Sequence, residues 1–389
     1  MNILNKSIVA AVLGLSVASV SHAGVIYLTG STAARSTVYT ALIAPGAVFQ
    51  SAPTVTTWDG SSPSGSTYMA FVGTLVGGSG STTIDCDWSG SEAGTKDVAD
   101  AEQESFLNPT TLNGQNNGTA VPTDVVNEMV NMCMADNAQA FSRTPSPAVG
   151  SQTEVGVVTF EFVRNPGLWT GTNVTDAQVQ AALGGFAPRA LFDGNSAHTG
   201  DFVYVEGRNN QSGTRVNAFG DTGFGILTSP NQIEINNSGV MQDLSGNGSG
   251  VFDGDFGFSS GGTLAATMGA NTTAQTDQIN VNTPNTAGFS VIAYLGLSDA
   301  ATAITAGGVA VSFNGIPFSA AAVEQGQYTF WGNEYCDLQA SPTTEETTAY
   351  HNLTSETTGI SSFGDGTIVI PLSSMDAKRS GPNSAPNHN

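Results

Sequence analysis

Short apolar runs alternate along this chain with segments that favour helices. Within residues 83–88, the alternation of Ile84, Cys86 and Trp88 places these three side chains on one face of a strand. The apolar runs predict strands at residues 25–29, 68–76, 83–88, 155–163, 202–206, 288–297, 309–314, 328–331 and 367–372. The intervening segments predict helices at residues 33–44, 95–106, 123–134, 179–183, from 215 onward and at 343–353. This order is typical of α/β lobes with mainly parallel sheets.

The length of the chain favours two lobes. Its 389 residues exceed what a single hydrophobic core usually covers. The 47 glycines and many small polar residues indicate numerous turns, while the frequent strand-like runs argue against disorder. Only residues 380–389, which are rich in proline and asparagine, are expected to form a loose tail.

The first 23 residues have the pattern of a secretory signal peptide. Lys6 gives a positive start, residues 8–20 are apolar, and Ser21-His22-Ala23 fits a cleavage site. The alternative is an anchor that stays in the membrane, but this apolar run is too short to span a bilayer comfortably, and no later segment is longer. We therefore expect a mature chain that begins near Gly24, has no membrane span and works in the periplasm or outside the cell.

The charge of the chain argues against one class of partner. The formal net charge is −22, and it becomes −23 without the signal segment, which contains Lys6 and no acidic residue. Such a surface repels nucleic acid, and no basic stripe is present, so nucleic-acid binding is excluded. A small anion is still a possible ligand where one arginine and local dipoles dominate inside a cleft.

Three cysteines in a secreted chain allow one disulfide and leave one thiol. We expect Cys86 to pair with Cys133, because both flank segments that we place in one lobe, and Cys336 to be buried and free. No spacing of cysteines and histidines suggests a metal cage, so no metal or other cofactor is expected.

Three Gly/Ser/Thr turns each follow a strand-like run and each open a predicted helix. They are Gly30-Ser31-Thr32, the segment 90–95 with Ser91 near its start, and Ser212-Gly213-Thr214. Glycine lets the backbone approach a ligand, while hydroxyls and free amides at a helix start donate hydrogen bonds to an anion. Arg208 lies four residues before the third turn. Because ligands bind at the carboxyl ends of strands in α/β sheets, these groups are expected to surround a small oxyanion.

Each of these features has a simpler alternative. A single such turn is typical of an ordinary helix N-cap, and Arg208 alone would suit a structural ion pair. The segment 90–96 has the wrong spacing for a phosphate-cradling nucleotide loop. The segment 257–261 matches a nucleophile elbow, in which an esterase would use Ser259 and His351, but no buried strand precedes it. We therefore do not expect an enzyme.

The sequence resembles the periplasmic phosphate-binding proteins that feed ABC transporters. The likeness is carried by Leu28-Thr29-Gly30 with Val38-Tyr39, by residues 90–98, by residues 208–214 and, more weakly, by residues 327–331. The element Arg-x-x-x-Ser-Gly-Thr at 208–214 is the most specific of these. The order and spacing fit along most of residues 24–340, with extra material at 99–138 and 216–285.

The resemblance implies the two-lobed, type II binding-protein fold, with each lobe a mainly parallel sheet flanked by helices. In this division, residues 24–158 form the first part of lobe 1, residues 159–330 form lobe 2, and residues 331–379 return to lobe 1. The lobes of such a protein close on a dehydrated tetrahedral anion.

The resemblance also implies ligand contacts. In the third turn, Ser212, Gly213 and Thr214 would donate hydrogen bonds, and Arg208 would pair with the charge of the ligand. In the second turn, the family's hydroxyl falls on Glu92, so the neighbouring Ser91 is the expected substitute. The first turn is one residue shorter than the family pattern, which leaves Ser31 or Thr32 as the donor and favours Thr32.

The main departure from the family lies at Ser142-Arg143. The family usually has Ser-Asp here, and the aspartate accepts a proton from the ligand's hydroxyl. Arg143 would accept phosphate and sulfate alike, unless it turns to a surface acid. Both residues remain candidate ligand contacts.

We thus expect a secreted solute-binding protein that captures phosphate or a similar oxyanion and delivers it to an ABC permease, without bond chemistry. The alternative is a surface or matrix interaction protein that retains the fold. The polar insertions, the high content of glycine, asparagine and threonine, and Arg143 suggest this alternative.

Overall fold

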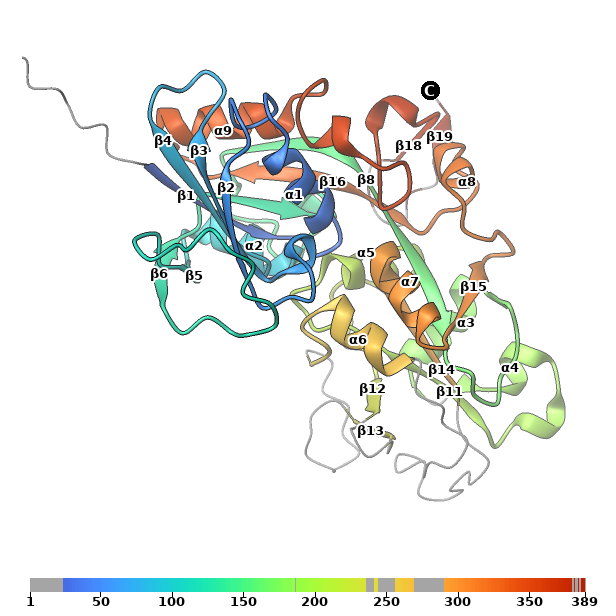
Figure 1. Cartoon of the computed structure of the whole chain (residues 1–389). Helices are drawn as coiled ribbons and strands as arrows, with labels where there is room; N and C mark the ends of the chain where they lie inside the picture. The colour runs from blue at the N-terminus through green and yellow to red at the C-terminus, as the bar shows by residue number, and fades with distance from the viewer. Residues whose placement is uncertain are drawn as a thin grey trace, which may run out of the picture.

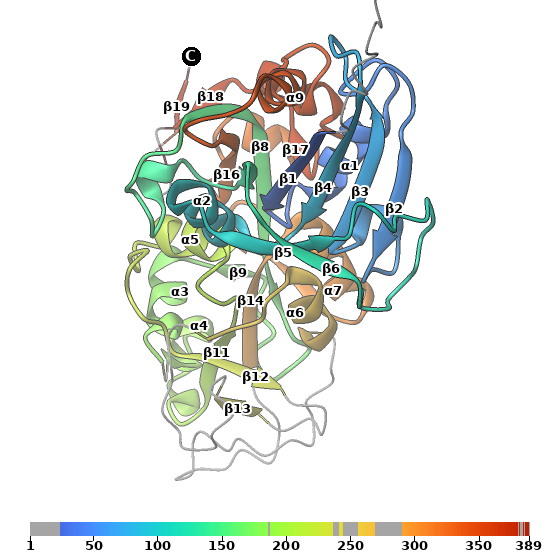
Figure 2. The ribbon, with the colours of Figure 1, turned by 90° about the vertical axis from the view of Figure 1, so that its left-hand side faces the viewer.

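One long strand, β8 (Ser151–Arg164), runs through both of two α/β lobes (Figures 1 and 2). The structure is a computed structural model that describes residues 24–185, 187–235, 241–243, 256–268, 290–379, 381, 384 and 386–388. The expected signal peptide at 1–23 lies outside the described residues. Within the described part of the chain, no helix is long and apolar enough to cross a bilayer.

The sheet of lobe 1 is built around strand β1 (Gly24–Gly30), which pairs in parallel with a strand on each side. The strand order is β2-β3-β4-β1-β7-β16-β8. The bounds of the other strands are β2 (Thr54–Trp58), β3 (Tyr68–Thr74), β4 (Ser81–Asp87), β7 (Met132–Ala135) and β16 (Trp331–Leu338). Because β1, β4 and β7 are parallel, their carboxyl ends meet at one edge of this lobe.

The sheet of lobe 2 continues from the second half of β8 in the order β8-β14-β11-β12-β13. Its strands are β9 (Asn173–Val174), β10 (Ala187–Pro188), β11 (Phe202–Glu206), β12 (Gln232–Ile235), β13 (Met241–Asp243), β14 (Ser290–Gly296) and β15 (Val309–Phe313). Strand β11 pairs in parallel with β12 and β14.

Strand β8 changes its partner where it passes from one lobe to the other. Up to Thr159 it pairs with β16, and from Phe160 onward it pairs with β14. Both pairings are antiparallel, and so is the pairing of β16 with β7. The sheets are therefore mixed rather than mainly parallel, because the strands that cross between the lobes run against their neighbours. The expected two-lobed α/β architecture is otherwise confirmed.

Helices cover both faces of each sheet. The described helices are α1 (Arg35–Ile43), α2 (Ser91–Asp100), α3 (Asp176–Leu183), α4 (Ala190–Asp193), α5 (Gly213–Asp221), α6 (Gly261–Met268), α7 (Leu297–Thr305), α8 (Ala320–Glu324) and α9 (Thr344–Thr354). In lobe 1, α1 and α9 pack in the main core, while α2 packs on the opposite face in a small cluster with Cys133. In lobe 2, α3 and α5 pack on one face, and α6 and α7 pack on the other.

Helix starts follow the local sequence closely. The expected capping box at Thr175 is present: its hydroxyl accepts from the Gln178 amide, and the Gln178 side chain accepts from the Thr175 amide. Thr343 and Glu346 make the same arrangement at α9. The remaining short elements are η1 (Pro63–Gly65), η2 (Gln139–Phe141), η3 (Ser196–His198), η4 (Ile360–Phe363), η5 (Leu372–Ser374) and β17 (Val369–Ile370).

Two predicted helices in lobe 1 are wrong. The first, at 95–106, ends at Asp100, because Ala101 takes a left-handed conformation with φ of 56°, and strand β5 (Gln103–Leu107) follows. The second, at 123–134, is two strands, β6 (Val125–Met129) and β7. Strand β6 pairs with β5 and alternates exposed and half-buried positions, which is a period of two and not of 3.6.

The predicted crossing strand at 328–331 is also displaced, because the strand begins at Trp331 as β16. At the other end of the chain, β18 (Ala377–Lys378) pairs with β19 (Asn387–His388), so the described part of the expected tail is held against the preceding segment.

The expected disulfide is wrong, and all three cysteines are free and buried. Cys86 on β4 pairs with Leu28, whereas Cys133 on β7 pairs with Thr29, so the two cysteines lie on opposite sides of β1. Two strand spacings amount to about 10 Å, which is longer than the reach of a disulfide. Their side chains also point to opposite faces of the sheet, since neighbours along β1 alternate.

Candidate functional site

The three Gly/Ser/Thr turns meet between the lobes at the carboxyl ends of β1, β4 and β11. Gly30 has φ of 115°, and a Cβ there would lie 2.1 Å from the carbonyl oxygen of Met134. Gly90 has φ of 114°, and a Cβ there would lie 2.5 Å from the carbonyl oxygen of Gln211 in lobe 2. Both positions require glycine, because the backbone is left-handed and the neighbouring chain is too close for a side chain.

The second and third turns touch each other across the lobes. A Cβ on Gly213 would lie 2.5 Å from Ser91 Oγ, so the first residue of α5 lies directly against the first residue of α2. The amide of Glu92 donates to the carbonyl oxygen of Gln211 at 3.0 Å. These contacts bring the N-termini of α2 and α5 together at one place.

Asp136, which the sequence analysis missed, lies at the centre of this arrangement. It follows β7 directly and is only 2% exposed. The Ser31 hydroxyl donates to Oδ1 of Asp136, and the Thr214 hydroxyl lies 3.4 Å from Oδ2. The amide of Asp136 donates to Ser91 Oγ at 3.1 Å. Asp136 is thus contacted by all three turns and from both lobes, through its carboxylate by Ser31 and Thr214 and through its backbone amide by Ser91.

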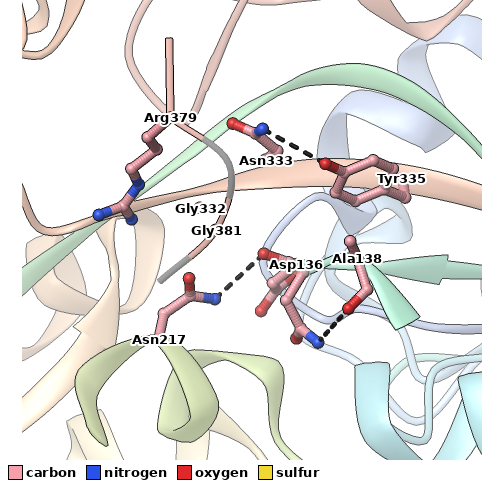
Figure 3. A pocket seen from close by; sticks show the side chains of 9 residues that line it. Asp136, Ala138, Asn217, Gly332, Asn333, Tyr335, Arg379 and Gly381 are labelled. Carbon is pink, nitrogen blue, oxygen red and sulfur yellow. Dashed lines mark hydrogen bonds between the residues drawn. The ribbon is translucent and has the colours of Figure 1, made fainter. Parts of the chain in front are cut away.

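Asn217 extends these contacts one turn further along α5. Its Nδ2 donates to the backbone oxygen of Asp136 at 3.1 Å and to that of Gly213 at 3.0 Å (Figure 3). The amides of Gly213 and Thr214 occupy the first positions of α5, where no intrahelical acceptor exists. Ser212 caps the helix by accepting from the Arg215 amide at 3.3 Å. Free donors and the positive end of the helix dipole therefore point toward Asp136.

Arg208 is buried in lobe 2, just after β11. Its guanidinium donates to the backbone oxygens of Phe258 at 3.1 Å and Ser259 at 2.9 Å. Burial lowers the pKa of Arg208, and the nearby carboxylates of Asp299 and Asp136 oppose this shift. Among the described residues, no carboxylate lies within 4.0 Å of this guanidinium, so the charge of Arg208 is held near Asp136 without a direct ion pair.

Other charges lie near this site as well. Asp299 on α7 is half-buried, and desolvation raises its pKa, whereas the charges of Arg208 and Arg35 oppose the shift. Burial also raises the pKa of Asp136, and its hydrogen bond from Ser31 opposes the shift. The site therefore combines two arginines with one buried and one half-buried carboxylate.

The remaining sequence candidates lie around this centre. Thr32 is half-buried next to Ser31, and it is Ser31 that reaches Asp136. Ser142 accepts from the Thr144 amide at 2.9 Å, and the Arg143 amide donates to Glu92 at 2.5 Å. Burial raises the pKa of Glu92 to about 7, and the Arg143 amide opposes this shift. Ser142 and Arg143 thus belong to a neighbouring group centred on Glu92, while Asp136 occupies the middle of the donor groups.

The alternative nucleophile Ser259 contributes its backbone oxygen to Arg208, and His351 lies on α9 of lobe 1. No cluster of three or more histidine, cysteine, aspartate or glutamate side chains suited to a metal ion occurs within the described ranges.

A small cavity borders Asp136 on the side of β16 (Figure 3). Its volume is about 10 Å³, which is roughly the space for one water molecule. The lining residues are Asp136, Asn137, Ala138, Asn217, Gly332, Asn333, Tyr335, Arg379 and Gly381. In this closed arrangement, a ligand at the donor groups has to replace contacts that Asp136 now makes.

Comparisons with known proteins give structural matches only. No protein-family model matches the sequence, and no curated protein gives a significant match. A putative phosphate ABC transporter substrate-binding protein from Clostridium perfringens is 13% identical with a TM-score of 0.46, and the match covers 90% of this chain and all of the other. An ABC-type phosphate transport receptor from Vibrio cholerae is 11% identical with a TM-score of 0.43, covering 83% and 90% of the two chains.

A PstS protein from Borrelia burgdorferi is 13% identical with a TM-score of 0.40, covering 86% of this chain and 94% of the other. These TM-scores lie below 0.5, so the likeness carries no inference about ligand or activity. The case for function rests on the geometry around Asp136.

Proposed function

We propose that this chain binds a tetrahedral oxyanion, phosphate or a close analogue, between its two lobes. The observation that carries the proposal is the meeting of Ser31, Ser91 and Thr214 at one buried point. Each comes from a different turn, and the third comes from the other lobe. Arg208 supplies a positive charge close by. Hydroxyls, helix N-termini and an arginine are the groups that recognise phosphate oxygens in proteins.

Asp136 gives this site a preference for a protonated anion. A carboxylate among the donors repels a fully ionised oxyanion such as sulfate, but it accepts a hydrogen bond from the hydroxyl of a phosphate. The role that the resemblance assigned to the position of Arg143 therefore falls on Asp136 in this proposal. Phosphate is the favoured ligand.

The strength of the site follows from the number of its donors. Each neutral donor to a charged acceptor contributes about 1.5–3 kcal/mol. Several of these, after the costs of ordering and association, are enough for micromolar affinity, about −8 kcal/mol. Strands β8 and β16 link the lobes, and bending at these strands would open and close the site.

In this proposal the protein works outside the cytoplasm, receives the anion from solution and passes it to an ABC permease. It catalyses no reaction and needs no cofactor.

Equilibrium dialysis of the purified secreted protein with labelled phosphate and labelled sulfate tests the proposal. Saturable binding of phosphate, and weaker binding of sulfate, is expected. Arg208→Gln should lower the affinity for phosphate at least about tenfold, because one charged interaction contributes about 1.5–3 kcal/mol. Arg143→Gln is the matched control and should leave the affinity unchanged. The absence of saturable binding of either anion would remove the proposal.

One observation favours a second candidate function. The hydroxyls of Ser31 and Thr214 already donate to Asp136, so an internal carboxylate occupies the donors that a ligand would use. A surface or matrix interaction protein that retains the fold would keep such a permanently closed site. It predicts that Arg208→Gln leaves function intact and that neither anion binds in the dialysis experiment.

A further inference from the structure

We propose that Glu334 carries a proton that it shares with Asp136, and that anion binding requires this proton. The inference rests on the proposed function, because it assigns a pH-sensing residue to the same site. Glu334 is a positioning residue in this scheme, since it acts on the anion through Asp136.

The register of two strands places Glu334 opposite Asp136. In the antiparallel pair of β16 and β7, Tyr335 faces Ala135 and Cys336 faces Met134. Asp136 follows Ala135 directly and Glu334 precedes Tyr335 directly, so the two residues lie one step beyond the paired segment, and their carboxyl groups interact with each other. Residues directly opposite each other in such a pair have Cβ atoms about 4.5–5.5 Å apart, which brings two carboxyl groups within hydrogen-bond reach.

Both carboxyl groups are removed from bulk solvent. Glu334 is 0% exposed and Asp136 is 2% exposed. Neither carboxyl oxygen of Glu334 makes a well-formed hydrogen bond among the described residues, and the nearby Ser31 hydroxyl donates to Asp136 instead. A buried carboxylate without donors is strongly unfavourable, and a second carboxylate across the strand pair makes it worse. A proton on Glu334 removes both the buried charge and the repulsion between the two carboxylates, because its O–H then donates to the Asp136 carboxylate.

The electrostatics agree with this assignment. Burial, followed by the charge of Asp136, raises the pKa of Glu334 well above its ordinary value. The hydrogen bond from Ser31 and the charge of Arg208 hold Asp136 as the ionised partner. The charged or titratable groups that act on this pair from the surrounding elements are Arg208 after β11, Glu92 on α2 and Asp337 on β16.

The protonation state of Glu334 determines the net charge of the site that binds the anion. With Glu334 protonated, the single charge of Asp136 is balanced by Arg208. When Glu334 loses its proton, a second negative charge appears next to the site with no added cation, and the anion is repelled. The raised pKa widens the pH range in which Glu334 is protonated. Affinity for the anion is present in that range and is lost as the pH rises through the pKa of Glu334 in the folded protein.

The test is the pH profile of phosphate affinity, measured by calorimetry on the full secreted protein and on Glu334→Gln. The wild-type affinity should fall at least about tenfold at alkaline pH, because one added charge a few ångströms away is worth that much even when well screened. Glu334→Gln keeps the shape and a donor to Asp136 without a titrating proton, so its affinity should fall less than that of the wild type over the same range.

The matched control is Glu161→Gln. Glu161 on β8 is also buried, and burial raises its pKa to about 7, but the shift has no charged neighbour as a cause. This variant should show the same fall in affinity as the wild type.

A second measurement keeps the inference testable if Glu334→Gln fails to fold. At alkaline pH, dianionic phosphate keeps its own proton, so binding to wild-type protein should take up a further proton, detected by calorimetry in buffers of different ionisation enthalpy. Phosphate binding that has the same pH profile in both proteins, or that takes up no proton, would overturn the role of Glu334 and leave the proposed function standing. Phosphate that does not bind even at acid pH would overturn the proposed function itself.

Discussion

Two groups of buried carboxyls in lobe 1 differ in what surrounds them. Asp136 receives a hydroxyl from each lobe and lies close to Arg208. Asp87, at the end of β4, has only acids as its nearest charged neighbours, and burial together with Glu104 and Asp97 raises its pKa to about 8.

The difference teaches that burial alone does not make a recognition site. Where the fold supplies donors from several elements, as it does at Asp136, hydrogen bonds and a nearby arginine oppose the rise in pKa that burial causes, and the carboxylate can take part in binding. Where the neighbours are other carboxyls, as at Asp87, the same burial favours the protonated form and makes the stability of the protein depend on pH.

The largest effect is expected from Asp136→Asn. The amide keeps the shape of the side chain but no longer repels a fully ionised anion, and its one uncharged acceptor oxygen binds a ligand hydroxyl more weakly than a carboxylate does. Phosphate affinity should fall about tenfold to hundredfold, from the roughly 1.5–3 kcal/mol of a charged hydrogen bond, while sulfate affinity should rise. Competition dialysis with both anions measures the change. Unchanged discrimination between them would show that Asp136 does not select the ligand.

The comparison predicts the opposite result for Asp87→Asn. Because the pKa of Asp87 is raised in the folded protein, this carboxyl contributes stability below the pKa of about 4 that it has when unfolded, and that contribution is lost as the pH rises through about 8. The variant should therefore be more stable than the wild type at pH above about 8, and similar or less stable near pH 4.

Urea unfolding at both pH values measures this difference. The exposed Asp376→Asn is the control and should change neither value. An Asp87→Asn protein that loses stability at alkaline pH would contradict the contrast between the two groups.

A smaller effect is expected from Gly213→Ala, which tests how closely the lobes approach. The added methyl group would lie 2.5 Å from Ser91 Oγ and 2.9 Å from Asp136 Cβ, so the two helix starts have to move apart. Overpacking of this kind costs about 1–3 kcal/mol. Thermal unfolding should show a lower Tm, with weaker phosphate binding. Gly200→Ala is the control, because no atom lies within 4 Å of its added methyl group.

The parts of the site that the sequence predicted are the ones that local residues determine. Gly30 and Gly90 need a left-handed backbone, and Ser212 caps a helix, so the positions of these turns follow from their own neighbours. That the turns after β1 and β4 lie together followed from the rule that parallel strands end at the same edge, whereas the third turn reaches them from the sheet of the other lobe.

The parts that the sequence did not predict depend on pairing between distant segments. Asp136 was missed because the helix predicted at 123–134 covers most of β7, and only the pairing with β1 identifies this segment as a strand. The same pairing places β1 between Cys86 and Cys133, which excludes their disulfide. The role proposed for Glu334 can be inferred only from the pairing of β16 with β7.

The continuity of β8 limits how this molecule can deform. Because the continuous strand β8 belongs to both lobes, the lobes cannot separate as independent bodies. Any opening of the site therefore requires β8 to bend. We expect β8 to bend most easily between Thr159 and Phe160, where its hydrogen-bonded partner changes from β16 to β14. The Thr159 hydroxyl restrains this position, because it donates to the carbonyl oxygen of Thr367 at 2.6 Å. Release of a bound ligand would thus depend on the stiffness of β8 and not on a flexible hinge loop.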